Sequence, residues 1–416
     1  MSIADSVAEQ SWFRDPALSR IFALLNQQGE EVRVVGGAVR NALMGLPVTD
    51  TDLATTWAPE QVAARARDAG IRSVPTGIDH GTVTLVIEGR GFEVTTLRHD
   101  AETDGRRARV AFGRDWQVDA ERRDFTINAL YADSGGRIID LVGGLDDIAT
   151  RTVRFIGDAD ARIAEDYLRV LRYFRFFAHY GTGRPDAAAL KACARARGKL
   201  GQLSSERVWK ELKTLLEARD PGRALLWMRQ AGVLTAVLPE SEKWGIDSMG
   251  GLIAAETALD WEPDPMLRLM AMVPPDAGRM RALAARLKLS RAETSRLVSW
   301  AEAPAFEPTL AITAFERMLY RIGTEPLIDR TRLSLVSART RAETAPEALT
   351  EAAGHSRHLA HALTWQRPVF PVAGADLIAI GVKPGPEMGA RLAALEERWV
   401  ESNFKLGKAA LLAQAD

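Results

Sequence analysis

The stretch VVGGAVRNALMGLPVTDTDLATT, residues 34–56, decides how the N-terminal part of the chain folds. The run Glu31–Val35 predicts a short strand, and Ala38–Gly45 predicts a helix that ends at its glycine. Between them, Gly36 and Gly37 let the backbone come close to phosphate oxygens, toward which the first helical amides point. Arg40 lies one turn into the helix, where it is predicted to neutralise phosphate charge. The alternative is a packing turn followed by a surface arginine.

The second half of the same stretch carries two carboxylates. Residues 49–56 alternate in polarity and predict a strand, so Asp50 and Asp52 point to the same face. Two adjacent negative charges repel each other, and Mg²⁺ held by one or two carboxylates together with substrate phosphates removes that repulsion. Further along, Glu93 is predicted to supply a third acid from a hairpin that turns at Gly89–Gly91. Alternatively, these acids are ordinary turn and surface residues.

The composition is that of a globular protein. Of the 416 residues, 26% are charged and 46% hydrophobic, which is enough chain for at least two folding units. A net charge of −1 gives no global attraction to nucleic acid, so any basic surface has to be local. The single cysteine, Cys193, excludes a disulfide framework and a cysteine-rich zinc site and favours a reducing, cytoplasmic location. No stretch reaches the roughly 20 apolar residues of a membrane helix, so no membrane partner is expected.

The sequence pattern changes near residue 140. Before it, short β-rich runs alternate with single helices, such as the one predicted to begin at Pro59. After it, helical periodicity continues almost to the end, as in residues 161–180. The predicted fold class is therefore α+β, a small mixed N-terminal head followed by a long all-helical neck, body and tail. The predicted boundaries are 14–148 for the head, 149–245 for the neck and 246–416 for the body and tail.

Five motifs follow one another along the chain: GGAVRN from Gly36, DTD from Asp50, RRDFTINAL from Arg122, DLVGGLDD from Asp140 and EDYLR from Glu165. In this order they resemble the class II CCA-adding tRNA nucleotidyltransferases and the bacterial poly(A) polymerases, within the superfamily that includes DNA polymerase beta. The family pattern has an aspartate where this chain has Asn41, and commonly a proline where it has Tyr167. Neither departure touches the two acids that are predicted to bind metal.

The resemblance implies a polymerase-beta-like catalytic head and template-independent addition of CCA to the 3′ end of tRNA. It implies CTP and ATP as substrates and pyrophosphate as the leaving group. Two Mg²⁺ ions are the implied cofactors, held by Asp50 and Asp52, with Glu93 as a third catalytic acid. The implied partner is the tRNA acceptor end, and no DNA. Two alternatives stay open: a poly(A) polymerase that adds adenosines to RNA 3′ ends, and a non-catalytic homologue that binds RNA or nucleotide.

The motif EDYLRVLRYFR suggests how a base is chosen without a template. On one helix, Asp166 and Arg169 are three residues apart and share a face. A carboxylate accepts from an exocyclic amine and a guanidinium donates to a ring acceptor, a combination that cytosine and adenine match and guanine and uracil do not. Arg172 and Arg175 continue the spacing and are predicted to reach the triphosphate or an acid elsewhere in the neck. The alternative is an amphipathic helix whose arginines pair with surface acids.

Residues 121–130, ERRDFTINAL, carry further nucleotide-binding candidates. Asp124 and Asn128 lie four apart at a predicted helix start, where they are suited to hold a ribose 2′-hydroxyl; Asp124 is equally suited to a simple N-cap. One of Arg122 and Arg123 is expected to contact the nucleotide, with Arg122 favoured. The polar residues 98–120 resemble a loop that helps CCA-adding enzymes switch from cytidine to adenosine, the alternative being a variable surface loop.

A local basic surface is predicted between residues 191 and 213, suited to RNA backbone phosphates, although a solvated helix pair is the commoner fate of such charges. The predicted RNA-binding residues are Lys191, Arg195, Arg197, Lys199, Arg207, Lys210 and Lys213. Three histidines, His355, His358 and His361, have no acid at a familiar metal spacing, so no zinc site is predicted. His80 is predicted to be a loop or hydrogen-bonding residue, not a general base.

Overall fold

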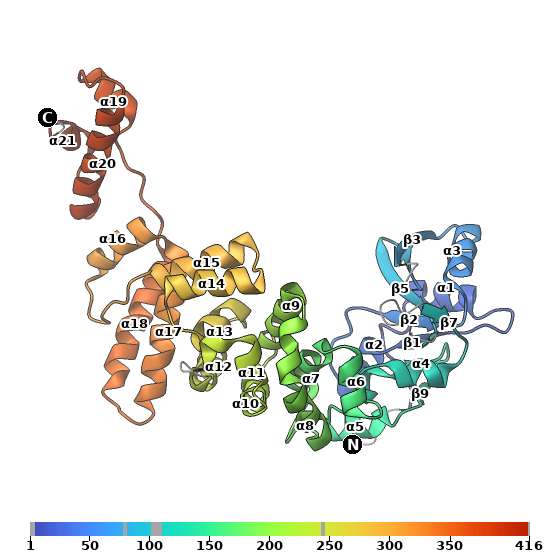
Figure 1. Cartoon of the computed structure of the whole chain (residues 1–416). Coiled ribbons are helices and arrows are strands. Elements are labelled where there is room, and N and C mark those ends of the chain that lie inside the picture. The colour runs from blue at the N-terminus through green and yellow to red at the C-terminus, as the bar shows by residue number, and fades with distance from the viewer. Residues whose placement is uncertain (1–4, 78–80, 101–109, 243–245, 415–416) are drawn as a thin grey trace. The chain divides into compact units, whose positions relative to one another are not determined.

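The computed structural model describes residues 5–77, 81–100, 110–242 and 246–414 (Figure 1). The chain divides into two compact units, Met1–Leu203 with Trp227–Ala236, and Ser204–Leu226 with Val237–Asp416. The predicted boundaries at 148 and 245 do not coincide with this division, and the three-part division stays a prediction.

A seven-stranded sheet forms the head within the first unit, in the order β3-β4-β5-β2-β1-β8-β9. β2 and β5 run parallel, and the other neighbours run antiparallel. Its strands are β1 (Val32–Val35), β2 (Asp52–Thr55), β3 (Arg72–Gly77), β4 (Thr82–Ile87), β5 (Arg90–Thr96), β8 (Leu130–Ala132) and β9 (Ile138–Asp140). A separate two-stranded ladder consists of β6 (Arg98–Asp100) and β7 (Val110–Phe112).

The hairpin of β4 and β5 turns slightly earlier than predicted. Ile87 pairs with Arg90, so Glu88 and Gly89 alone form the turn, at φ values of 51° and 78°. Two-residue turns with positive φ at both positions match the twist of the flanking strands. Arg90 and Gly91, which were expected in the turn, are therefore strand residues.

The helices of the head carry common start and stop signals at several of their ends. They are α1 (Pro16–Leu25), α2 (Gly37–Met44), α3 (Pro59–Asp68), α4 (Trp116–Arg122) and α5 (Gly144–Thr150). Pro16 and Pro59 occupy first turns, where a missing amide donor breaks no bond. Asp15 and Asp115 accept hydrogen bonds from first-turn amides of α1 and α4. Gly45 ends α2 in the left-handed conformation, with φ 69°.

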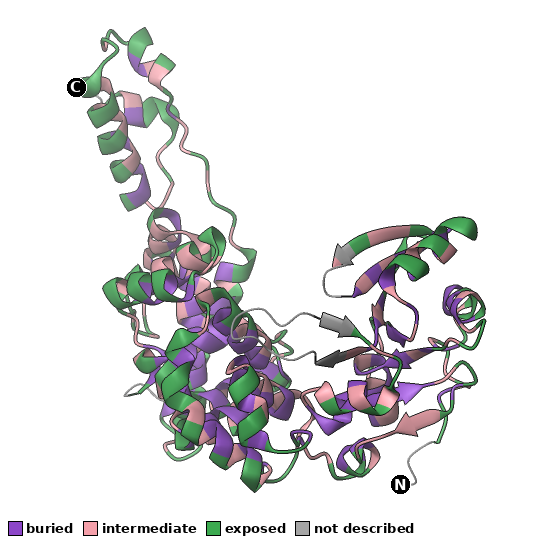
Figure 2. Ribbon diagram, turned by 45° about the vertical axis from the view of Figure 1, so that its right-hand side comes forward, coloured by how far each residue is buried: buried purple, intermediate pink, exposed green. Residues whose placement is uncertain are grey.

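The rest of the first unit is helical, with α6 (Ala159–Glu165), α7 (Leu168–Tyr180), α8 (Ala187–Ala196) and a 3₁₀ segment at Arg197–Gln202. The sequence predicts one continuous helical pattern over residues 161–180, but the chain breaks between α6 and α7. The cause is Asp166, whose backbone is extended at φ −153° and ψ 108°. The buried residues of α7 include Leu171, Phe174 and Phe177, which lie three apart on the helix. Figure 2 colours the described residues by burial.

The second unit contains only helices among its described residues. Two of the following, α10 and α11, cross the division between the units. The helices are α9 (Ser205–Leu216), α10 (Gly222–Gln230), α11 (Val233–Val237), α12 (Asp247–Ala258), α13 (Pro265–Met272), α14 (Ala277–Leu287), α15 (Arg291–Glu302), α16 (Ile312–Ile322), α17 (Thr324–Ala342), α18 (Ala348–Thr364), α19 (Gly374–Ala379), α20 (Pro386–Glu401) and α21 (Lys408–Leu412).

The predicted fold class, a mixed α+β head followed by a helical remainder, is confirmed. No helix in the described part of the chain is long and apolar enough to cross a membrane.

Candidate active site

Two of the predicted catalytic acids lie on the neighbouring strands β2 and β5. Asp52 is the first residue of β2. Leu53 pairs with Val94 of the parallel β5, so Asp52 and Glu93 each directly precede a paired residue. Both acids are exposed, while Val94 and Phe92 on either side of Glu93 are buried. The strand alternation therefore turns both carboxylates away from the core, as expected.

The charges of three acids meet at this place. The pKa of the Asp52 carboxyl is raised, first by desolvation and then by the charges of Glu93 and Asp50, while the charge of Arg123 lowers it. Asp50 precedes β2 and does not lie in the strand predicted for residues 49–56, yet its charge still acts on Asp52. Two neighbouring carboxylates disfavour the charged form of Asp52, and a bound cation would stabilise that charged form.

The donor set fits Mg²⁺ that arrives with a nucleotide. In the described segments, no three His, Cys, Asp or Glu side chains come together as a complete metal cage. Mg²⁺ commonly takes only one or two carboxylates and completes its octahedron with water and substrate phosphates. Asp50 and Asp52, with Glu93 close by, offer such a partial set of oxygen ligands.

The turn between β1 and α2 has a backbone that requires glycine. Gly36 has φ 71° and ψ −115°, which L side chains rarely adopt. A Cβ added there would lie 3.4 Å from the carbonyl oxygen of Asn128 and 3.7 Å from Nη1 of Arg123. Gly37 follows as the first residue of α2. The predicted phosphate-binding turn thus has a conformation that favours glycine and lies directly before a helix N-terminus.

Arg123 lies close to both this turn and the acids. Its guanidinium donates to Oδ2 of Asp119 at 3.1 and 3.2 Å and to Oη of Tyr131 at 3.3 Å. Tyr131 donates in turn to Asp119 at 2.8 Å. Burial disfavours the charge of Arg123, but Asp119 and Tyr131 outweigh it and raise its pKa. The sequence favours Arg122 as the nucleotide contact, whereas these positions favour Arg123.

Arg40 is buried, with 6% of its surface exposed, so the alternative of a surface arginine is wrong. It donates to Oδ1 of Asn128, to Oη of Tyr180 at 2.7 Å and to Oδ1 of Asn41 at 2.8 and 3.1 Å. Its guanidinium also lies 3.9 Å from the centre of the Tyr180 ring. Burial lowers the pKa of Arg40, and the charge of Arg175 lowers it further. Arg40 therefore joins α2 to the end of α7, and its contact with phosphate stays a prediction.

Asp124, a residue of the head, contacts α7. Its Oδ1 accepts from the Phe125 amide at 2.9 Å and from Nδ2 of Asn128 at 3.3 Å, and its Oδ2 accepts from Nε of Arg172 at 2.8 Å. Residues Thr126–Asn128 form a single 3₁₀ turn preceded by Phe125, so Asp124 is not an N-cap. Arg172 therefore pairs with an acid of the head. The ribose contact of Asp124 and Asn128 stays a prediction.

The predicted base-reading pair lies at the α6–α7 junction, not on one helical face. The extended Asp166 accepts the amide of Leu168 on Oδ1 and the amide of Arg169 on its carbonyl, both at 3.0 Å. The side chain of Arg169 donates to Glu165 and, at 2.7 Å, to the carbonyl of Arg162. The shared helix face is therefore wrong, because Asp166 precedes the first turn of α7. Base recognition by Asp166 and Arg169 stays a prediction.

The remaining cations of the predicted nucleotide set lie on α4 and α7. Arg122 is the last residue of α4. Burial lowers the pKa of Arg98, and the charge of Arg122 lowers it further. Arg175 lies 4.5 Å from the centre of the Phe176 ring. The nucleotide contacts of Arg122 and Arg175 stay predictions.

The predicted RNA-binding residues fall in both compact units, four in the first and three in the second. Arg195 pairs with Asp160 at 2.9 Å, and Lys213 pairs with Glu293 at 2.9 Å. Lys191, Lys199 and Lys210 are exposed. Two more are exposed as well, Arg197 and Arg207. The paired members are held by acids, while the exposed lysines present their charge to solvent.

Of the predicted loop at residues 98–120, residues 101–109 lie outside the described residues, as does His80. The described remainder is not a plain surface loop, because it forms β6, β7 and the start of α4. His358 is buried between the carbonyl oxygens of Gly354 and Leu310, each 2.8 Å from a ring nitrogen. His361 meets Glu316 at 3.0 Å. These contacts give two of the three histidines a structural role.

Four residues of this region were missed by the sequence reasoning. Glu165 binds Arg169, and Asp119 holds Arg123 from four residues away, a spacing that could have indicated the pair. Tyr131 and Tyr180 carry no sequence signal, because their arginine partners come from other elements.

Comparison with known proteins places this geometry in a family. Residues 32–154 match the poly A polymerase head domain, and residues 185–244 match the probable RNA and SrmB-binding site of polymerase A. The chain is 34% identical to the mitochondrial CCA tRNA nucleotidyltransferase 1 of Danio rerio over 393 residues, 92% of this chain and 86% of that protein. It is 38% identical to the CCA-adding enzyme of Geobacillus thermodenitrificans over 228 residues, 54% of this chain and 55% of that protein.

A solved structure extends the similarity to the fold. The CCA-adding enzyme of Bacillus stearothermophilus in complex with CTP superposes with a TM-score of 0.74 and 28% identity over 95% of both chains. With the head domain, the order of the five motifs and a relative matched over nearly its full length, the chain belongs to the CCA tRNA nucleotidyltransferase family.

Proposed function

We propose that this chain adds CCA to the 3′ end of tRNA from CTP and ATP, without a template and with release of pyrophosphate. The observation that carries the proposal is the set of three carboxylates formed by Asp52, Glu93 and Asp50, next to a glycine turn and Arg123. The chain is similar to a CCA tRNA nucleotidyltransferase over more than nine-tenths of its length.

The residues divide the reaction between them. The terminal 3′-hydroxyl of the RNA attacks the α-phosphate, the bond to the bridging oxygen breaks, and pyrophosphate leaves. Asp50 and Asp52, with Glu93, would hold two Mg²⁺ ions, which when bound lower the pKa of the attacking hydroxyl and neutralise the triphosphate. The amides after Gly36 and the charge of Arg123 orient the phosphates. No histidine is needed as a general base.

Asp166 and Arg169 select the base in this proposal. A carboxylate that accepts from an amine and a guanidinium that donates to a ring nitrogen match cytosine and adenine. In the free protein the guanidinium of Arg169 donates a hydrogen bond to Glu165. When a base binds, a ring nitrogen of that base replaces Glu165 as the acceptor. A base with a carbonyl at the amine position leaves the carboxylate unpaired, which discriminates strongly in a buried site.

The tRNA acceptor end is the proposed RNA partner, bound with the help of the exposed basic residues between 191 and 213. A cytoplasmic location is proposed from the single cysteine, Cys193.

The test is incorporation into a tRNA that lacks its last three nucleotides, with all four triphosphates present and the product sequenced. Addition of CCA and a stop supports the proposal. A long adenosine tract identifies a poly(A) polymerase, and no incorporation identifies a non-catalytic homologue. Asp52→Asn should lower incorporation by about 10²–10³-fold, the usual effect of removing one group that stabilises charge in the transition state. Asp146→Asn, at an exposed position of α5, is the matched control.

A further inference from the structure

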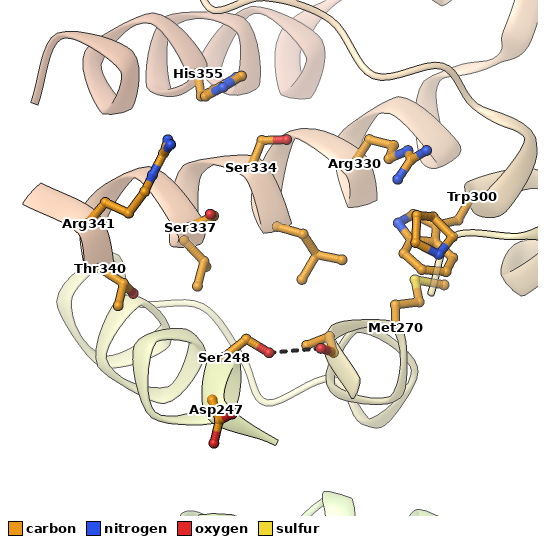
Figure 3. A pocket seen from close by; sticks show the side chains of 14 residues that line it. Asp247, Ser248, Met270, Trp300, Arg330, Ser334, Ser337, Thr340, Arg341 and His355 are labelled. Atoms are coloured by element: carbon orange, nitrogen blue, oxygen red, sulfur yellow. Dashed lines mark hydrogen bonds between the residues drawn. The ribbon is translucent and has the colours of Figure 1, made fainter. Parts of the chain in front are cut away.

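The second unit contains a cavity of about 560 Å³ that none of the proposed catalytic residues lines (Figure 3). Its walls come from α12, α13, α15, α17 and α18, all within one compact unit. A cavity of this size is within the range of small-molecule sites.

Two buried side chains among the lining residues, Trp300 and His355, each have a ring nitrogen without a partner. Trp300 is 2% exposed and His355 is 6% exposed. Trp300 Nε1 and His355 Nδ1 are both buried, and neither has a hydrogen-bond partner among the described residues. Indole Nε1 can only donate a hydrogen bond. Nearly all buried polar atoms in folded proteins are paired. Two of the unpaired ones belong to residues that line this cavity, and a polar ligand in it would supply partners for them.

One face of α17 carries a row of hydrogen-bonding side chains into the cavity. Arg330, Ser334, Ser337 and Arg341 lie at spacings of four, three and four residues, and Figure 3 shows them along the same wall. The mouth is at Ser337 and Arg341, which are exposed, while Arg330 lies deeper and is half-buried.

The charges in the lining favour an anion. Nε of Arg330 donates to the carbonyl of Ala303 at 2.9 Å, and Arg330 has no carboxylate partner in the part of the chain that the structure describes. Burial lowers the pKa of Arg330, which is the response of a cation that lacks a counter-charge. Arg341 already pairs with Glu351 at the mouth. Asp247 is the single acid among the lining residues.

Part of the wall opposite α17 is apolar and includes Met270, Ala271 and Pro275, while Asp247 and Ser248 of α12 lie on the same side, and the ring of Trp300 lies beside Arg330 (Figure 3). A ligand consisting of an inorganic anion alone would leave this wall uncovered. The lining therefore suits a molecule with an apolar or aromatic body and one acidic group.

We propose that this cavity binds a small organic anion, with its carboxylate, sulfonate or phosphate group on Arg330 and its apolar body against Met270 and Trp300. The site is separate from the proposed nucleotide site, and its occupant is a free small molecule, not the RNA.

The probe for the test is 1-anilinonaphthalene-8-sulfonate, an aromatic body with one sulfonate, titrated by fluorescence into the full-length protein. One equivalent should bind. Arg330→Met, which keeps the side-chain length and removes the charge, should weaken binding roughly tenfold or more. Ser337→Leu, at an exposed position of the mouth, should weaken it by filling the space. Arg339→Met, on the same helix but outside this cavity, should leave binding unchanged.

Competition by two other ligands tests whether the probe binds in this cavity and not at the nucleotide or RNA site. CTP and tRNA should not displace the probe, since neither is expected in this cavity. Displacement by either, or binding unchanged in both Arg330→Met and Ser337→Leu, overturns the proposal. Circular dichroism shows whether each variant is folded. If Arg330→Met is unfolded, probe binding by Ser337→Leu decides the test. CCA addition by the Ser337→Leu protein should equal that of the parent chain, so failure of this proposal is distinct from failure of the proposed function.

Discussion

Asp52 carries a carboxyl group whose surroundings oppose its own charge. Desolvation and the charges of Glu93 and Asp50 raise its pKa. In the folded, metal-free protein this carboxyl binds a proton more tightly than in the unfolded chain, so the protein loses stability as the pH rises through the raised pKa. The arrangement that suits metal binding therefore destabilises the protein until the metal arrives.

Asp52→Asn should consequently melt at a higher temperature than the parent chain at pH 8 in the presence of EDTA, by about 1–2 °C. The difference should shrink as the pH falls through the raised pKa, because the parent carboxyl then becomes neutral as well. Scanning calorimetry at a series of pH values measures both. Asp146→Asn should instead melt slightly lower, since it removes a favourable charge from the first turn of α5. A lower melting temperature for Asp52→Asn at pH 8 would contradict the expectation.

The two adjacent arginines of the RRDFT motif should differ in their effect on nucleotide binding. Arg123→Lys loses the forked contacts with Asp119 and Tyr131 that position its charge beside the Gly36 turn. We expect kcat/KM for CTP and ATP to fall about 10- to 100-fold, the range for lost charge-assisted hydrogen bonds. Arg122→Lys is the matched control and should change kcat/KM less than about threefold. Equal losses in the two variants would contradict the assignment.

At this scale the sequence predicts the direction in which single side chains point better than it predicts their partners. The alternation around Glu93 is sufficient to turn its carboxylate out of the core. Nothing in GGAVRN indicates that Arg40 is buried, because Asn128 and Tyr180 come from distant parts of the chain. Asn41 supplies an acceptor oxygen to Arg40, which is the property that it shares with the aspartate of the family pattern.

Among the elements, the α6–α7 junction is the largest difference between the predicted and the observed structure. Residues 161–180 contain neither glycine nor proline, so the sequence shows no break in their helical periodicity. The break is local to Asp166, which is extended and accepts the amide of Leu168. Tyr167 follows at φ −60° and ψ −16°.

This geometry explains how a tyrosine can stand where the family commonly has a proline. The φ of Tyr167 is the value that a proline ring fixes, and the extended Asp166 is compatible with a following proline. Tyr167→Pro should therefore fold and keep its activity with CTP and ATP. Leu168→Pro should lose activity for two reasons. It removes the backbone amide that donates to Asp166, and it puts a proline ring in place of a buried leucine side chain. Urea denaturation and the incorporation assay measure both. An unfolded Tyr167→Pro protein would refute this account of the junction.

For the whole molecule, the sequence predicts the succession of a mixed head and a helical remainder, and the structure confirms it. The periodicity of strands and helices is a local property, which is why it can be read along the chain. Where the compact units divide is not local. Residues Trp227–Ala236 belong to the first unit although residues 204–226 before them belong to the second, and such a return depends on contacts that no composition shift marks.

The charge of the whole chain is close to zero, so RNA affinity must depend on local cations whose contribution is visible in its salt dependence. Lys210 is exposed on α9, while Lys213 on the same helix is paired with Glu293. Lys210→Gln should reduce the slope of log K against log salt for tRNA binding by about one. Lys213→Gln should leave the slope unchanged. Filter binding between low and moderate salt provides the two slopes, and identical slopes would remove Lys210 from the RNA surface.

The two links between α7 and the head limit how the enzyme can change its preference during one round of addition. Arg172 bonds to Asp124 near the middle of α7, and Tyr180 bonds to Arg40 at its end. A tilt of α7 relative to the sheet would break at least one of these arginine contacts, and the one made by Arg40 is buried. If the junction selects the base as proposed, the exchange of an incoming pyrimidine for a purine is accommodated by rotation of side chains there or by the growing RNA terminus itself.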